Sequence, residues 1–154
     1  MVKFLNVAIR KMREEDLVIV SELAMLANPH AVKEKYYKHI AHELRENPDL
    51  SFVAVEDGKV VGYVQADFRG DVAVIEDIAV AKRYQKKGIG RLLLNEMLKA
   101  LKRKGANVVF VEVHYKCSSA IPFYYKFNFR ISGFSQDYFG VGHDAVILKK
   151  LIPK

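Results

Sequence analysis

Ile75-Glu-Asp-Ile-Ala-Val-Ala-Lys-Arg-Tyr-Gln-Lys-Lys-Gly-Ile-Gly-Arg91 is the stretch around which the chain is organised. It begins within an apolar run, residues 72–80, which predicts a strand interrupted by two acids, Glu76 and Asp77. A basic turn covers residues 82–87, and after Gly88 the apolar residues recur at helical spacing. These recurring residues are Ile89, Leu92, Leu93, Met97, Leu98 and Leu101. The stretch therefore predicts a strand, a turn and a helix start in succession.

The turn before this helix is suited to an anion. The first N–H groups of a helix have no partner inside it, and the helix dipole adds partial positive charge there. Gly88 and Gly90 have no Cβ to obstruct a ligand, and Lys86, Lys87 and Arg91 add full charges. The P-loop pattern is absent, and no G-x-G-x-x-G follows the first strand, which argues against a dinucleotide fold. The turn predicts a pyrophosphate site of another kind.

Composition sets the class of protein. A chain of 154 residues predicts one domain, 1–154, and 51% hydrophobic with 28% charged residues indicates a soluble globular protein. The apolar runs are short for a membrane span, and the first residues lack the features of a signal peptide. Cys117 is the single cysteine, so we expect no internal disulfide, no metal site and a cytoplasmic location. The net charge of +7 favours an anionic partner such as nucleic acid or a phosphorylated cofactor.

The remaining sequence predicts an α/β fold of the mixed α+β kind. Apolar periodicity, glycines and prolines place the elements along the chain. Strands are expected at 6–10, 51–55, 59–68, 72–80, 108–113, 130–134 and 145–150, and helices at about 17–27, 31–46, 89–104 and 118–127. The two strands around the central helix should be parallel because their connection is long, whereas the hairpins should be antiparallel. We expect a single central mixed, mostly antiparallel sheet of about seven strands with helices on both faces.

Two motifs resemble those of a known family. Gln85-Lys-Lys-Gly88-Ile-Gly90 resembles the Q/R-x-x-G-x-G/A signature of the GNAT superfamily of acetyl-CoA-dependent N-acetyltransferases. Ala120-Ile-Pro-Phe-Tyr124-Tyr-Lys126-Phe-Asn128-Phe129 is similar to its N-x-x-A-x-x-L-Y-x-K-x-G-F segment. Cys117 replaces the usual Asn, and Asn128 replaces the usual Gly in a turn whose left-handed conformation Asn tolerates. The C-terminal half is most similar to ribosomal-protein and N-terminal alanine acetyltransferases, and the resemblance implies the GNAT fold.

The resemblance also implies acetyl-CoA as the acetyl donor and assigns its contacts. Backbone groups of residues 78–80 would pair with the pantetheine arm and stabilise the oxyanion, and the turn would hold the pyrophosphate. The implied cofactor-binding residues are Ile78, Ala79, Val80, Gln85, Lys86, Lys87, Gly88, Ile89, Gly90, Arg91, Cys117, Ser119, Tyr124 and Lys126. Tyr124 is the implied general acid, because a phenol of pKa about 10 is protonated at neutral pH and can protonate a departing thiolate.

Two glutamates compete for the role of general base. Glu112 lies in an otherwise apolar strand, where burial would raise the pKa of its carboxyl towards a useful range. The related ribosomal-protein acetyltransferases carry a Glu at this position, eight residues before the Ala that matches Ala120. Glu76 is the rival, because Ile75-Glu-Asp resembles the acidic segment with which polyamine acetyltransferases hold a cationic amine. His114 shares a strand face with Glu112 and is interpreted as a proton relay or a surface histidine.

The acceptor is expected to be a primary amine. Tyr36 and Tyr138 resemble the aromatic residues that close over a peptide in N-terminal acetyltransferases, which favours a protein or peptide N-terminus. Asp77 beside Glu76 keeps open a polyamine or aminoglycoside-like acceptor. A sensor that binds acetyl-CoA without turnover is a further alternative. Nucleic-acid binding is weakly supported, because the basic residues gather at the cofactor turn. A monomer or a homodimer fits the sequence equally.

Overall fold

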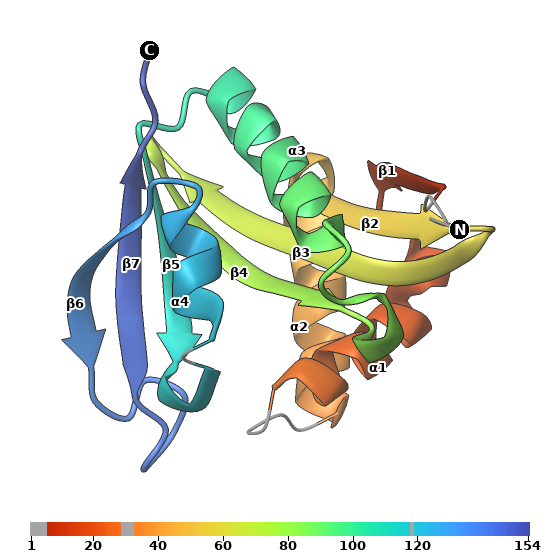
Figure 1. Ribbon diagram of the computed structural model, residues 1–154, viewed down its shortest axis with the longest axis horizontal. Helices are drawn as coiled ribbons and strands as arrows, with labels where there is room; N and C mark the ends of the chain where they lie inside the picture. The colour runs from red at the N-terminus through yellow and green to blue at the C-terminus, as the bar shows by residue number, and fades with distance from the viewer. Residues whose placement is uncertain (1–5, 29–32, 118) are drawn as a thin grey trace.

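The computed structural model describes residues 6–28, 33–117 and 119–154, which form one open seven-stranded sheet with helices packed on it (Figure 1). The strands are β1 (Val7–Lys11), β2 (Ser51–Glu56), β3 (Lys59–Arg69), β4 (Val72–Val80), β5 (Val108–His114), β6 (Arg130–Ser135) and β7 (Ala145–Leu151). The helices are α1 (Leu17–Ala27), α2 (Lys33–Glu46), α3 (Ile89–Lys104) and α4 (Ala120–Tyr125). Short 3-10 turns lie at η1 (Glu14–Asp16), η2 (Pro48–Leu50), η3 (Lys82–Tyr84) and η4 (Tyr115–Cys117).

The sheet has the order β1-β2-β3-β4-β5-β7-β6, and β4–β5 is its parallel pair. The other neighbouring strands are antiparallel, as predicted. Pairing between β4 and β5 runs from Val72 opposite Val108 to Ile75 opposite Val111 and then stops. Both strands continue beyond this point and diverge, which Figure 1 shows as a fork between β4 and β5. The second half of β4 is therefore paired on its β3 side alone.

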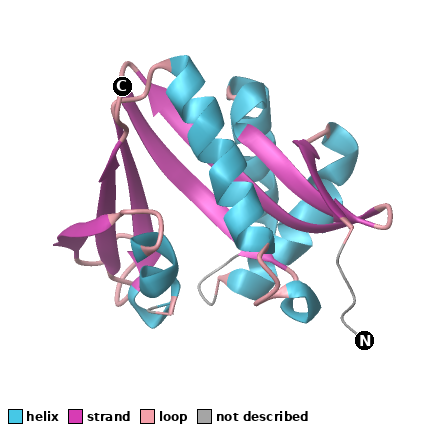
Figure 2. Ribbon diagram, turned by 45° about the horizontal axis from the view of Figure 1, so that its top comes forward, coloured by secondary structure: helices cyan, strands magenta, loops and turns pink. Residues whose placement is uncertain are grey.

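Helices cover both faces of the sheet (Figures 1 and 2), as the sequence predicts. On one face, α3 and α4 pack over a core that includes Leu93, Met97 and Phe129. On the other face, α1 and α2 pack over a second core that includes Val20, Ile40 and Tyr63. None of the helices in the described ranges is long and apolar enough to cross a membrane.

The predicted element boundaries hold to within a few residues, with two corrections. The last helix is shorter than predicted and covers Ala120–Tyr125; the predicted first residues of this helix and of α2, Ser118 and Ala31, lie outside the described ranges. Leu92, expected on the buried stripe of α3, is 44% exposed. At about 100° per residue the buried residues of α3 centre on Leu93 and Met97, which turns Leu92 towards solvent.

Candidate active site

A β-bulge in β4 decides how the two acids of the organising stretch are placed. Gln65 pairs with Asp77 and Ala66 with Ile75, so Glu76 is the extra residue without a partner on β3. In a regular strand, consecutive side chains point to opposite faces, but a bulge disturbs that alternation. Asp77 contacts the end of α1 and Glu76 contacts α2, so both acids lie on the α1/α2 face. The bulge stands directly after the last β4–β5 pair, at the mouth of the fork.

Asp77 is held by three donors. Its Oδ2 accepts hydrogen bonds from the Tyr63 hydroxyl and from Asn28 Nδ2, the latter at 3.3 Å, and its Oδ1 accepts the Ile78 N–H at 2.9 Å. Asn28 Nδ2 also donates to the Ala24 carbonyl at 2.8 Å, which ties the carboxylate to the end of α1. Burial raises the pKa of Asp77, and the three hydrogen bonds oppose that rise. Sequence reasoning missed Tyr63 and Asn28, because an aromatic residue in a strand and an Asn at a helix end carry no sign of this contact.

A second group of acids lies beside the fork on the same face. Glu76 forms an ion pair with His39 of α2, with 3.6 Å between Oε2 and Nε2. This contact raises the pKa of His39. Burial, followed by the charge of Glu76, raises the pKa of both Glu43 and Glu112. Tyr138, half-exposed on the loop between β6 and β7, lies close enough to Glu112 to oppose the rise in its pKa. The structure thus brings both candidate bases and one predicted acceptor residue together.

Tyr124 lies on the opposite face of the sheet. It is 3% exposed, and its ring packs edge-on against Phe129 with 5.3 Å between centroids. Its neighbour Tyr125 is exposed, so Tyr124 is the inward-facing tyrosine of α4. Burial and then the charge of Asp77 raise the pKa of Tyr124, which keeps the phenol protonated at neutral pH. The same two influences raise the pKa of the partly buried Cys117 thiol.

Backbone groups of β4 face the fork. The Ala81 N–H donates to the Val61 carbonyl on β3 at 2.8 Å. In an antiparallel ladder such bonds recur at every second residue, so Ala79 also faces β3, whereas Ile78 and Val80 face away from it. The Val80 carbonyl accepts Gln85 Nε2 at 3.0 Å. The Ile78 N–H already donates to the side chain of Asp77. The groups that remain directed at the fork are therefore the Val80 N–H and the Ile78 carbonyl.

The predicted anion turn has the expected geometry. Gly88 caps α3 with φ +86°, and no side-chain hydrogen bond caps the first turn of the helix. Lys86 also has a positive φ of 62°, which makes the turn tight. The basic residues of this segment form no ion pair with any residue that the structure describes. They are Lys82, Arg83, Lys86, Lys87 and Arg91. These charges therefore add to the helix dipole rather than cancelling against nearby acids.

Comparison with known proteins agrees with this architecture. The model of the acetyltransferase (GNAT) family matches residues 17–129. The chain belongs to the GNAT family. It is 31% identical over 153 residues to an N-alpha-acetyltransferase of Sulfurisphaera tokodaii, covering 91% of this chain and 90% of that protein. It is 28% identical over 102 residues to the ribosomal protein bS18 alanine N-acetyltransferase of Escherichia coli, covering 64% and 69%.

A solved GNAT structure shows the same fold. Arabidopsis thaliana Naa50, in complex with the bisubstrate analogue CoA-Ac-MVNAL, superposes with a TM-score of 0.83 at 22% identity, covering 96% of this chain and all of that one. The chain is accordingly an acetyl-CoA-dependent acyltransferase. Its uncapped helix start with unpaired basic side chains fits a pyrophosphate, and the open half of β4 fits the pantetheine arm.

The other residues implied by the GNAT resemblance differ in how the fold exposes them. The side chains of Ile89 and Ala79 are buried in the cores. Ile89 can offer a ligand its backbone at the start of α3, whereas the backbone groups of Ala79 face β3, which corrects its expected contact with the cofactor. Ser119 and Lys126 are exposed at the two ends of α4. Tyr36 of α2 is partly buried against the core under α1 and α2, and burial followed by the charge of Asp77 raises its pKa. Gly90 lies close to α4: a Cβ there would stand 3.5 Å from the Phe123 ring.

His114 is a buried residue, which corrects its interpretation as a surface histidine. It is 3% exposed, and its Nε2 lies 2.9 Å from Nδ1 of His143. Its Nδ1 accepts the Lys116 N–H at 3.1 Å, so the proton of a neutral ring belongs on Nε2. Burial lowers the pKa of His114. The residue anchors the loop that carries Tyr138, since His143 belongs to the same loop.

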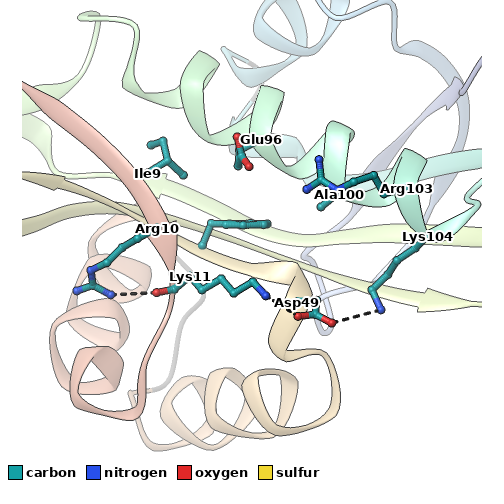
Figure 3. A pocket seen from close by; sticks show the side chains of 9 residues that line it. Ile9, Arg10, Lys11, Asp49, Glu96, Ala100, Arg103 and Lys104 are labelled. Atoms are coloured by element: carbon teal, nitrogen blue, oxygen red, sulfur yellow. Dashed lines mark hydrogen bonds and ion pairs between the residues drawn. The ribbon is translucent and has the colours of Figure 1, made fainter.

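A pocket of about 430 Å³ lies away from these residues, between β1, β2 and the far end of α3 (Figure 3). Its charges are largely paired: Asp49 binds Lys11 at 2.7 Å and Lys104 at 3.8 Å. Arg10, on its rim, is held by Asp16. The pocket therefore belongs to the packing of β1 against α3 and does not extend the fork. Among the described residues, no group of three or more His, Cys, Asp or Glu side chains is placed to hold a metal ion.

Proposed function

We propose that this enzyme acetylates the α-amino group at a protein or peptide N-terminus, by direct attack of the amine, with Glu112 as base and Tyr124 as acid. One observation carries the proposal: Glu112 and Tyr124 flank the fork from opposite faces of the sheet. Val111 and Val113 belong to the core under α3 and α4, so Glu112 between them faces α1 and α2. Tyr124 lies within that same core, on the α3/α4 face. An amine approaching from one face thus meets the base, and the acid stands on the other.

The residues divide the proton transfers between them. Acetyl-CoA, when bound, supplies the acetyl group as a thioester. Glu112 accepts a proton from the attacking amine, directly or through water, and its raised pKa brings it nearer the range useful for a base. Tyr124 donates a proton to the departing sulfur, and the Val80 N–H supports charge that develops on the carbonyl oxygen.

The raised pKa of Glu112 also supports an N-terminal acceptor. An α-amino group has a pKa of about 7.7–8.0 and a lysine amine about 10.4, so deprotonating lysine at neutral pH costs several kcal/mol more. One carboxylate of raised pKa suits the first amine better. Tyr138, which lies near Glu112, is half-exposed and available to contact a peptide. The N-alpha-acetyltransferase relatives support the same class of acceptor.

A small cationic amine is the second candidate acceptor. The bulge places Glu76 and Asp77 on the acceptor face, and Glu43 lies near Glu76. Three acids on one side of the fork favour a substrate with more than one positive charge, such as a polyamine. Glu76 would then be the residue that matters most, because it is the acid exposed at the bulge.

A single substrate panel separates the two candidates. Initial rates of CoA release are measured for peptides with a free N-terminus, the same peptides acetylated at the N-terminus, and spermidine, using the wild type, Glu112→Gln and Glu76→Gln. We expect free peptides to be the best acceptors, and Glu112→Gln to impair them more than Glu76→Gln. A preference for spermidine that is lost in Glu76→Gln and kept in Glu112→Gln would replace this proposal with the small-amine function. Lack of turnover with every amine would favour a sensor.

A further inference from the structure

The open segment of β4, residues 78–80, is held at both ends by side chains. β5 would normally bond the backbone groups that face the fork, but its pairing stops at Val111. At one end, Asp77 Oδ1 accepts the Ile78 N–H at 2.9 Å. At the other end, Gln85 Nε2 donates to the Val80 carbonyl at 3.0 Å. Two side chains therefore take the places that a neighbouring strand would fill.

What these two side chains leave unbound matters for the reaction. The Ile78 carbonyl and the Val80 N–H remain directed at the fork, one acceptor and one donor from alternate residues of the same edge. An extended ligand containing amides can bond such a pair in the way an added strand does. A bare strand edge can bend, and a displacement of about 1 Å can cost about 10²-fold in rate. Fixing both ends of the segment therefore keeps these two groups in place for the reaction.

We propose that Asp77 and Gln85 are positioning residues for the acetyl transfer, which hold the open segment of β4 so that the Ile78 carbonyl and the Val80 N–H meet the donor. Asp77 suits this role, because Tyr63 of β3 and Asn28 at the end of α1 bind its second oxygen. Three bonds from three elements leave its carboxylate little freedom to turn towards an amine. The inference rests on the proposed function for its kinetic test but not for its structural test.

The groups around Asp77 agree with a fixed carboxylate. Tyr63, Tyr36, Tyr124 and Cys117 come from four different elements. Burial raises the pKa of each of them, and the charge of Asp77 adds to that rise. His39 is the one titratable group in this set whose charge lowers the pKa of Asp77. These aromatic and thiol groups stay protonated around neutral pH, so these four neighbours add no charge beside the open segment there.

The structural test is amide hydrogen exchange at residues 78–81, measured by NMR on the folded chain. In Asp77→Ala, we expect the Ile78 amide to exchange at least about tenfold faster, because its acceptor is gone. Asp77→Asn retains an oxygen for that N–H and should stay close to the wild type. Glu22→Ala, an exposed acid on α1, is the control. Gln85→Ala tests the other end without touching the core and should speed exchange of the Ala81 amide, which belongs to the same peptide unit as the Val80 carbonyl. Unchanged exchange in both alanine variants would overturn the inference.

The kinetic test uses the best acceptor of the substrate panel. Positioning predicts that Asp77→Ala lowers kcat by about 10²-fold with little change in the KM of the acceptor. Asp77→Asn should keep most of the activity, because it keeps the bond to the Ile78 N–H. An equal loss in both variants, or a raised acceptor KM, would show that the charge of Asp77 binds the substrate and would overturn the positioning role. If the wild type acetylates no amine, the proposed function fails, while the exchange experiment still decides this inference.

Discussion

Tyr138 lies close enough to Glu112 to lower the pKa of its carboxyl, although the two residues come from a loop and a strand and are 26 positions apart in the chain. Tyr138 opposes the rise that burial and Glu76 impose on the pKa of Glu112, and burial with the charge of Glu112 raises the pKa of Tyr138. A base and an aromatic residue suited to a peptide are thereby held side by side. The pH dependence of the enzyme should follow from this pair.

Glu112→Gln should depress kcat/KM by about 10²-fold at acidic to neutral pH, the loss expected for a positioned base. Partial recovery is expected at more alkaline pH, because an α-amino group of pKa about 7.7–8.0 then loses its proton unaided. The measurement is kcat/KM against pH for a peptide with a free N-terminus. Equal pH profiles for the two proteins would contradict the assignment of Glu112.

The same variant should be more stable than the wild type at neutral pH. The folded pKa of Glu112 lies above its unfolded value, so the folded state binds this proton more tightly. Stability from this group is full below the unfolded pKa and is lost as pH rises through the folded pKa. Glutamine has no charge to bury, so we expect Tm to rise by about 1–3 °C near pH 7 and the difference to vanish in acid. Thermal unfolding of both proteins across this pH range checks the sign.

Tyr124→Phe should lower kcat by about 10²-fold or more while leaving the KM for acetyl-CoA nearly unchanged. Phenylalanine keeps the edge-on contact with Phe129, so stability should hold. Tyr125→Phe, at the exposed neighbour, is the matched control and should behave like the wild type. Normal turnover in Tyr124→Phe would mean that water or another group protonates the sulfur.

Gly90→Glu should abolish the rise in Tm that acetyl-CoA causes, because it places bulk and negative charge at the uncapped start of α3. Gly90→Ala is the control for bulk. Its Cβ would stand 3.5 Å from the Phe123 ring, an ordinary contact, so it should retain most of the shift. If acetyl-CoA raises the Tm of Gly90→Glu as much as that of the wild type, the pyrophosphate binds elsewhere.

Cys117→Ala should leave kcat within about threefold of the wild type. Burial and the charge of Asp77 raise the pKa of the thiol, which disfavours the thiolate that a covalent route through this residue would need. Stopped reactions analysed by intact mass should show no acetylated cysteine. Loss of turnover in Cys117→Ala, together with an acetylated intermediate in the wild type, would rule out direct attack.

Local features of the sequence determined the fold and the anion-binding turn of the candidate site. Gly88, at a helix start with a positive φ, marks a position where the backbone itself demands a residue type. The left-handed turn expected at Asn128 is confirmed, with φ +67°. The order of strands and helices followed from apolar spacing, since each element buries one face. These properties depend on residues close together in the chain, so they can be predicted without knowing which distant residues they contact in the fold.

Tertiary structure alone decided how the acids are used. The bulge at Glu76 exists because β3 pairs with β4 in a shifted register, and it turns both acids to one face. The bonds from Tyr63 and Asn28 to Asp77, and the burial of His114, depend on strands and helices that meet only after folding. A side chain's pKa and its hydrogen-bond partners are set by what surrounds it in space, and sequence spacing does not encode those distances. For that reason the residue type of Asp77 suggested a substrate contact, whereas its place in the fold suggests a support for the strand that meets the donor.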